Sequence, residues 1–123
     1  MQVIANLSQA VVAPSKRITA TDTSAAVDLS AFTGEVLFEL NSSAMEGAAQ
    51  TSDVKLTHCD TSGGTYTDSG IAFDQITTAG GASFQSKLRN VDGLKQFVKV
   101  VNTLGGSTPA VTFGVTITGK KGA

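Results

Sequence analysis

The feature that most constrains this chain is a strict alternation of apolar and small residues near its C-terminal end. The alternating residues are Val111, Phe113, Val115 and Ile117 on one side and Thr112, Gly114, Thr116 and Thr118 on the other. Successive side chains of a β-strand point to opposite faces, whereas an α-helix would spread this pattern around its whole surface. The alternation therefore predicts a strand that buries one face and leaves a Thr-lined face in water.

A second apolar run, Phe97–Val101, lies just upstream of this strand. Val98 and Val100 fall on one face, and Lys99 and its apolar neighbours fall on the other, so we expect the second face to be half covered. The segment between the runs, Leu104–Pro109, contains two glycines, a serine and a proline, which are residues favoured in turns. We therefore predict that the two runs form a long β-hairpin.

Short alternating runs separated by turn residues recur along the rest of the chain. We expect about eight short strands with turns every 8–12 residues or so, which is typical of an all-β sandwich or barrel. A chain of 123 residues is long enough to bury one hydrophobic core. The sequence thus predicts an all-β fold, a single-domain antiparallel β-sandwich, jelly-roll-like, over residues 16–123, preceded by an N-terminal arm over residues 1–15.

The predicted strands also predict the core. Upstream of the C-terminal pair, strands are expected at Lys16–Ala20, Ala25–Leu29, Glu35–Ser42, Val54–Cys59, Phe73–Thr77 and Ser83–Arg89. In the longer strands, the alternate positions that carry the larger apolar side chains are assigned to the buried face. The predicted core residues are Val36, Phe38, Leu40, Val54, Leu56, Phe84, Leu88, Val98, Val100, Val111, Phe113, Val115 and Ile117.

Residues 1–15 differ from the rest of the chain because they carry no charge and include several β-branched residues. The apolar spacing also fits a short helix stopped by Pro14, but disordered tails are usually more polar than this, and apolar residues without a facing partner generally lie on a neighbour. We therefore expect an extended arm that binds a neighbouring subunit or a partner's sheet edge. The predicted partner-binding residues are Val3, Ile4, Leu7, Val11 and Val12.

The formal net charge is −1, so no overall field draws the chain to nucleic acid or to an anionic membrane. The charges are nevertheless segregated, because acidic residues dominate between Ile18 and Asp74 and basic residues dominate after it. Oppositely charged regions suit contact between copies, although scattered solvation of the surface explains the pattern equally well. Together with the uncharged arm, this predicts a homo-oligomer, a trimer first and a dimer second, with no nucleic-acid or membrane partner.

Three features bear on the compartment. The single cysteine, Cys59, excludes an internal disulfide. The N-terminal residues lack the basic region and long apolar core of a signal peptide. No run approaches the roughly 18 apolar residues that a membrane span needs. We expect a soluble protein that matures in a cytoplasm.

The chain offers little for catalysis. His58 and Cys59 are the only adjacent base and nucleophile, but neighbouring strand residues point to opposite faces and cannot form a dyad. One His and one Cys are too few for a zinc site, and the aspartates near predicted turns lack the spacing of a calcium loop. Glu35 and Glu39 share a strand face but lie roughly 13 Å apart, too far for a glycosidase pair. We therefore predict no catalytic residues, no metal and no cofactor.

Several stretches resemble the head decoration proteins of tailed bacteriophages, also called cement or auxiliary proteins. The resemblance rests on Gly34–Phe38, Val54–Tyr66, Leu94–Val101, Thr103–Gly106 and Thr112–Phe113. It implies a β-sandwich subunit that binds the major capsid protein on the outside of the capsid and stiffens the shell, with no catalytic residues. It also implies synthesis in the host bacterial cytoplasm and residence on the capsid exterior of the virion.

Two rival classes remain open. A phage tail-tube or head-completion protein would also be all-β, but tube subunits polymerise through heterologous contacts. A virion-surface receptor- or carbohydrate-binding β-sandwich would ordinarily stack its ligand on aromatic platforms. The chain has no Trp and only one tyrosine, Tyr66, which counts against carbohydrate binding.

Overall fold

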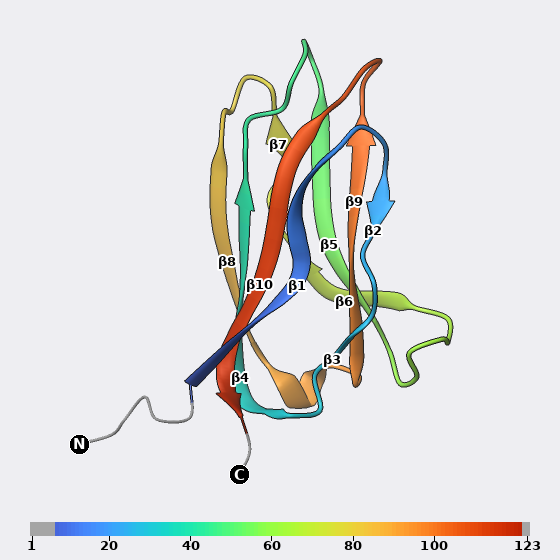
Figure 1. Ribbon diagram of the computed structural model, residues 1–123, viewed down its shortest axis with the longest axis vertical. Coiled ribbons are helices and arrows are strands. Elements are labelled where there is room, and N and C mark those ends of the chain that lie inside the picture. The colour runs from blue at the N-terminus through green and yellow to red at the C-terminus, as the bar shows by residue number, and fades with distance from the viewer. Residues whose placement is uncertain (1–6, 122–123) are drawn as a thin grey trace, which may run out of the picture.

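The computed structural model describes residues 7–121, where regular structure is almost entirely β (Figure 1). The strands are β1 (Leu7–Ile18), β2 (Asp22–Thr23), β3 (Val27–Asp28), β4 (Phe32–Ser42), β5 (Thr51–Cys59), β6 (Thr67–Ala72), β7 (Ile76–Thr77), β8 (Ser83–Asn90), β9 (Phe97–Gly105) and β10 (Val111–Lys121). One turn of 3₁₀ helix, η1 (Val91–Gly93), leads from β8 to β9. Over residues 7–121 there is no helix that is long and apolar enough to cross a membrane.

The strands form two antiparallel sheets that face each other (Figure 1). Sheet A has the order β1-β10-β4-β8, and sheet B has the order β2-β9-β5-β6, with β3 also paired to β9 and β7 to β5. The chain changes sheet on leaving β1, β3, β4, β7, β8 and β9, so most neighbours within a sheet are distant in the sequence. This arrangement is a jelly roll, and the predicted antiparallel, jelly-roll-like sandwich is confirmed.

The predicted C-terminal hairpin is wrong. β9 pairs with β5 in sheet B, whereas β10 lies between β1 and β4 in sheet A. Each strand has an apolar face to bury, and placing the strands in opposite sheets lets these faces pack against each other across the core. The segment between Gly105 and Val111 therefore crosses the end of the sandwich. The Thr-lined face of β10 is partly exposed, as predicted.

The core lies between the inward faces of the two sheets and contains most of the predicted residues. Val36, Phe38, Leu40, Val54, Leu56, Val98, Val100, Val111, Phe113, Val115 and Ile117 are all buried. The core also takes in apolar residues that the alternation does not identify, from β1, the start of β4, the shorter strands and the loops. These are Val12, Ala13, Ile18, Leu29, Phe32, Met45, Ile71, Phe73 and Ile76.

The prediction is wrong for Phe84 and Leu88, which are 66% and 55% exposed. β8 is an edge strand, and the register pairs its Gln85 with the buried Leu40 of β4, so Gln85 occupies the inward face. Gln85 Oε1 accepts a hydrogen bond of 2.7 Å from the backbone N–H of Asp74. Polar side chains on the inward face of β8 thus close the side of the sandwich, and its apolar side chains point outward.

The predicted arm over residues 1–15 is corrected for the part that the structure describes. Leu7 to Ile18 form β1, which pairs with β10 of the same chain. Val12 is 2% exposed and belongs to this chain's own core. The uncharged part of β1, up to Ser15, satisfies its backbone groups and buries an apolar side chain against β10, so it needs no neighbouring subunit to do so. Residues 1–6 lie outside the described part of the chain.

The chain between β1 and β4 also differs from prediction. The expected strands at Lys16–Ala20 and Ala25–Leu29 are replaced by the end of β1 and by the two-residue strands β2 and β3. β2 lies between the two expected strands, at Asp22–Thr23. Within the described residues, both short strands pair only with β9, at the edge of sheet B. Few backbone N–H and C=O groups of a neighbouring strand are available there for hydrogen bonding.

We predict that Phe113→Ala lowers the free energy of unfolding by about 3–5 kcal/mol, because Phe113 is buried between the sheets. Phe84→Ala is the matched control: its ring is exposed, so at low protein concentration the change should stay within about 0.5 kcal/mol. Urea denaturation of both variants checks the assignment of faces. Equal losses in the two variants would contradict it.

Candidate functional site

His58 and Cys59, the candidate catalytic pair, close β5 and have separate partners. His58 Nδ1 accepts a hydrogen bond of 3.3 Å from the backbone N–H of Lys95. Cys59 Sγ lies 3.8 Å from Thr61 Oγ1, and hydrogen bonding, led by the backbone N–H of Thr61, lowers the pKa of the thiol. The alternation of β5 thus directs the two side chains to different surroundings, and His58 is engaged with Lys95 and not with the thiol.

The carboxylates mostly hold local structure. Asp53 accepts two hydrogen bonds from Gln75 Nε2, at 3.1 and 3.2 Å, and Asp68 accepts one of 2.8 Å from the backbone N–H of Gly70. Glu39 accepts one of 3.3 Å from Thr118 Oγ1 on the neighbouring strand. Within residues 7–121 no three His, Cys, Asp or Glu side chains gather in a group that could hold a metal ion.

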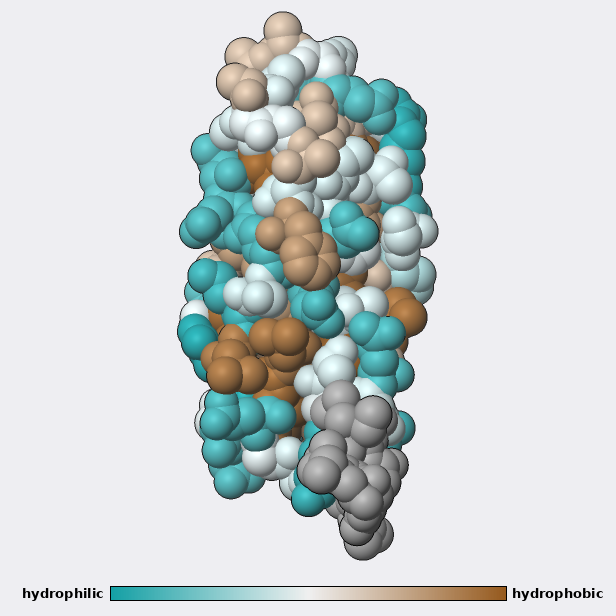
Figure 2. Space-filling model, turned by 90° about the vertical axis from the view of Figure 1, so that its left-hand side faces the viewer, coloured by the Kyte–Doolittle hydropathy of each residue, from teal (hydrophilic) through white to brown (hydrophobic). Residues whose placement is uncertain are grey.

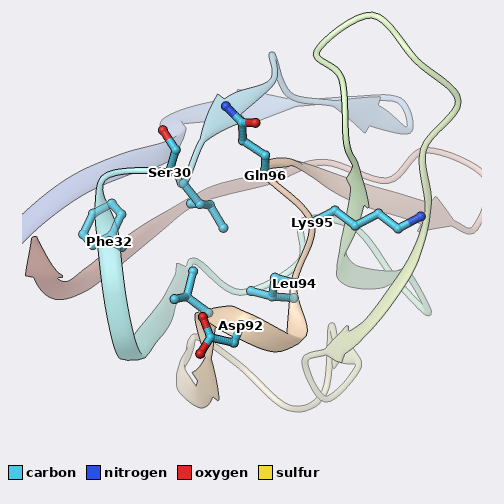
Figure 3. A pocket seen from close by; sticks show the side chains of 8 residues that line it. Ser30, Phe32, Asp92, Leu94, Lys95 and Gln96 are labelled. Carbon is cyan, nitrogen blue, oxygen red and sulfur yellow. The ribbon is translucent and has the colours of Figure 1, made fainter. Parts of the chain in front are cut away.

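A hollow of about 360 Å³ opens at the end of the sandwich, beside η1 (Figure 3). It is lined by Leu29, Ser30, Phe32, Val91, Asp92, Leu94, Lys95 and Gln96. Figure 3 shows the Lys95 side chain pointing away from the hollow. Gln96 Nε2 donates a hydrogen bond of 3.3 Å to Asp28 Oδ1, so this amide is already engaged. Neither side chain is positioned to recognise a charged ligand in the hollow.

Asp28 near this hollow predicts a pH dependence of stability. The backbone N–H of Ser30 donates a hydrogen bond of 2.8 Å to Asp28 Oδ1 and, with smaller contributions from the side chains of Ser30 and Gln96, lowers the pKa of the carboxyl. Because the native carboxyl has the lower pKa, its contribution is complete above about pH 4, the usual value for the unfolded chain, and is lost as the pH falls through the native pKa.

We therefore predict that the parent protein is more stable than Asp28→Asn at about pH 7 and that this difference disappears by about pH 2. Asparagine keeps an oxygen that accepts the same hydrogen bond, so the comparison isolates the charge. Urea unfolding of both proteins across this range measures the difference. A difference that stayed constant on acidification would contradict the assignment.

The predicted partner-binding residues are separated by the structure. Val3 and Ile4 lie outside the described residues, and Leu7 begins β1. Val12 is buried in the core, but Val11 is 56% exposed on the outer side of sheet A. Of the two predicted residues whose burial the structure describes, Val11 therefore lies on a surface that a partner would reach and Val12 does not.

The jelly-roll topology also mixes the charges that the sequence segregates. The acidic β4 lies between β10 and β8, which carry basic residues, and β5 lies beside β9 with its lysine. Acidic and basic segments are therefore neighbours in both sheets, and the topology does not collect them into two opposite faces. Contact between copies through charged faces stays a prediction.

The outer face of sheet A is the most conspicuous surface of the described residues. The large exposed apolar residues are Val11 on β1 and Phe84 and Leu88 on β8. Leu37 of β4, half buried, lies directly opposite Leu88 in the register and shares its face. Figure 2 shows apolar side chains gathered on this side of the molecule within a largely polar surface. Clustered exposed apolar residues mark interaction sites more often than single ones do.

A second hollow, of about 350 Å³, crosses this face. Phe84 forms one wall, Val11 and Pro14 form the other, and Gly114 and Thr116 of β10 lie between them. Gly114 has no side chain, which leaves space in the hollow. It also lets β1 approach closely, because a Cβ at position 114 would lie only 3.2 Å from the backbone of Ser15. The face therefore has apolar walls at its two edge strands and a depression over its central strands.

The sequence alone does not reveal this surface, because the alternation of β8 is compatible with either of its two faces pointing into the core. Hydrophobicity alone assigns Phe84 and Leu88 to the inward face. One feature of the sequence favours the opposite orientation. The other face of the strand carries a glutamine, a lysine and an arginine, which are long enough to reach from one sheet to the other at the edge of a sandwich. Arg89 does this, since its Nη2 donates a hydrogen bond of 3.2 Å to the backbone oxygen of Gly70.

Comparisons with known proteins bear on the fold alone. No protein-family model matches the chain, and no curated protein matches it significantly. Among solved structures, the T13 particle of infectious bursal disease virus has a TM-score of 0.60 at 13% identity over 93% of this chain. The VP2 subviral particle of the same virus has a TM-score of 0.54 at 12% identity over 93%.

A third similar structure is that of dimeric latent PorU from Porphyromonas gingivalis, with a TM-score of 0.53 at 10% identity over 94% of this chain. The chain spans 31% and 32% of the two virus chains and 12% of PorU. It thus corresponds to a part of each of these larger proteins. At such low identities the likeness establishes a β-sandwich that viral structural proteins also use, among others.

Proposed function

We propose that the protein is a structural component of a bacteriophage virion that binds the outer surface of the capsid and stabilises it. Its partner would be the major capsid protein, and its place the capsid exterior after synthesis in the host cytoplasm. The observation that carries the proposal is a single-core jelly roll of the kind found in virus particles. The sequence resemblance to phage decoration proteins supports the same role.

The body of the molecule suits a part that must keep its shape under load. Each sheet is held by continuous antiparallel pairing, and the sheets share one core. Arg17 of β1 makes a two-point contact with Glu46 in the β4–β5 loop, at 2.8 and 3.2 Å, which ties the edge strand to the loop end of the sandwich. A cement protein requires this kind of body and no chemistry of its own.

Carbohydrate binding is the less favoured alternative. The single tyrosine, Tyr66, has the ammonium group of Lys99 4.4 Å from the centre of its ring. One face of the ring is therefore occupied by a cation and is not free to stack on a sugar. A tail-tube or head-completion role is the other alternative, and it differs in how the purified protein assembles.

We predict that the purified protein binds in a saturable manner to capsids of the phage that encodes it and raises the temperature at which those capsids release their DNA. Gradient sedimentation and a thermal-release assay measure the two effects. Phe113→Ala, which lowers the population of folded protein, should lower both together. Tubes seen by electron microscopy of the protein alone, or its absence from purified virions, would contradict the proposal.

The corrected arm allows a sharper test of attachment. A truncation at Ser15 would remove most of β1 and part of the core, so it would report on folding. Deletion of residues 2–6, which include Val3 and Ile4, removes only residues ahead of β1. We predict that this deletion leaves the unfolding midpoint unchanged and weakens capsid binding. Unchanged binding would remove these residues from the partner-binding set.

A further inference from the structure

We infer that the outer face of sheet A binds a second copy of this chain, in a twofold-symmetric dimer. The face carries a projection and a depression side by side. Phe84 stands 66% exposed on β8, and the 350 Å³ hollow lies next to it over Gly114 and Thr116. In the dimer, Phe84 of each copy enters the hollow of the other.

The pairing of a projection with a depression on one face points to this symmetry. In a twofold interface the same patch serves both subunits, so a group that projects from one copy must meet a recess that the other also possesses. The hollow falls within the size range, about 300–1,000 Å³, of pockets that enclose small molecules, which is ample for one aromatic ring. Val11 and Pro14 on its far wall supply the apolar contacts that a buried ring needs.

The charge pattern of the face favours a second copy as the occupant. Between Leu37 and Asn41 on β4 and between Gly114 and Thr118 on β10, the only charged side chain is Glu39. Its carboxylate accepts a hydrogen bond from Thr118 Oγ1 at the edge of the hollow. A second copy presents the same nearly uncharged surface, so the carboxylate of Glu39, which lines the hollow, is the charged group of these segments that loses water on contact.

The size of the face is sufficient for a stable dimer. Strands of about ten residues at about 3.4 Å per residue, four abreast at about 4.8 Å, cover roughly 650 Å². Two copies would then bury about 1,300 Å², within the range of about 1,200–2,000 Å² for specific interfaces. Sheets pack face to face in this way within β-sandwiches, so the contact uses a geometry that the fold already contains.

Sedimentation equilibrium of the full chain, without capsids, tests the inference. The parent should show a reversible monomer–dimer equilibrium. Phe84→Ser should weaken the dimer at least about tenfold, as expected for loss of a central aromatic anchor, and Leu88→Ser should weaken it less. Phe97→Ser is the matched control, because Phe97 lies on the outer side of sheet B. Circular dichroism establishes that each variant is folded, and Phe97→Ser should dimerise like the parent.

Three results would overturn the inference. They are a parent that stays monomeric at all concentrations, a trimer or larger ring, and a dimer that Phe84→Ser and Phe97→Ser affect equally. A monomeric parent whose capsid binding depends on Phe84 would assign the face to the capsid. That result would reject the dimer while leaving the proposed function intact, and a dimer that binds no capsid would do the reverse.

Discussion

The fold depends on the burial of one side of β10. This strand lies between β1 and β4 in sheet A, and its inward residues, Val111 to Ile117, pack against the inward face of sheet B. Among the described strands, β1 pairs within its sheet with β10 alone, so β10 supplies its ladder hydrogen bonds. The same contact positions β4, whose Val36, Phe38 and Leu40 face the core. Loss of this buried face would therefore weaken the strand that joins β1 to β4 within sheet A.

The edges of the sandwich obey a different constraint from its centre. At the edges of the sandwich, apolar side chains of one sheet do not pack against the other sheet. Long polar side chains can instead reach the other sheet or its loops and form hydrogen bonds there. On β8, Gln85 donates to the backbone oxygen of Asp74 at 3.0 Å and accepts from its N–H at 2.7 Å. At one end of the core, Ser52 Oγ donates to Asn102 Oδ1 over 2.6 Å with both residues buried. These contacts satisfy the amide of Gln85 and the Oδ1 of Asn102, whereas the Nδ2 of Asn102 is buried without a hydrogen-bond partner among the described residues.

The outward apolar face of β8 follows from this use of its inward face. A strand has only two faces. Because Gln85 and Arg89 point toward the edge between the two sheets, Phe84 and Leu88 must point to solvent. Sheet A consequently has apolar residues on both of its faces. The inner face packs into the core, and the apolar part of the outer face is available to a partner. Pro14 and the irregular pairing of β1 near it disturb the opposite edge, which limits strand addition there and leaves the face itself as the accessible surface.

The sequence by itself determined the strands with strict alternation and the identity of most core residues, because period two fixes which side chains share a face. It also determined that His58 and Cys59 point apart. Only the tertiary structure decided which sheet each strand joins. The link between β9 and β10 fits a hairpin or a crossover equally well, and burial of both apolar faces across one core favours the crossover. It also decided the face of β8 and the place of β1, because those depend on strands distant in the sequence that local period does not specify.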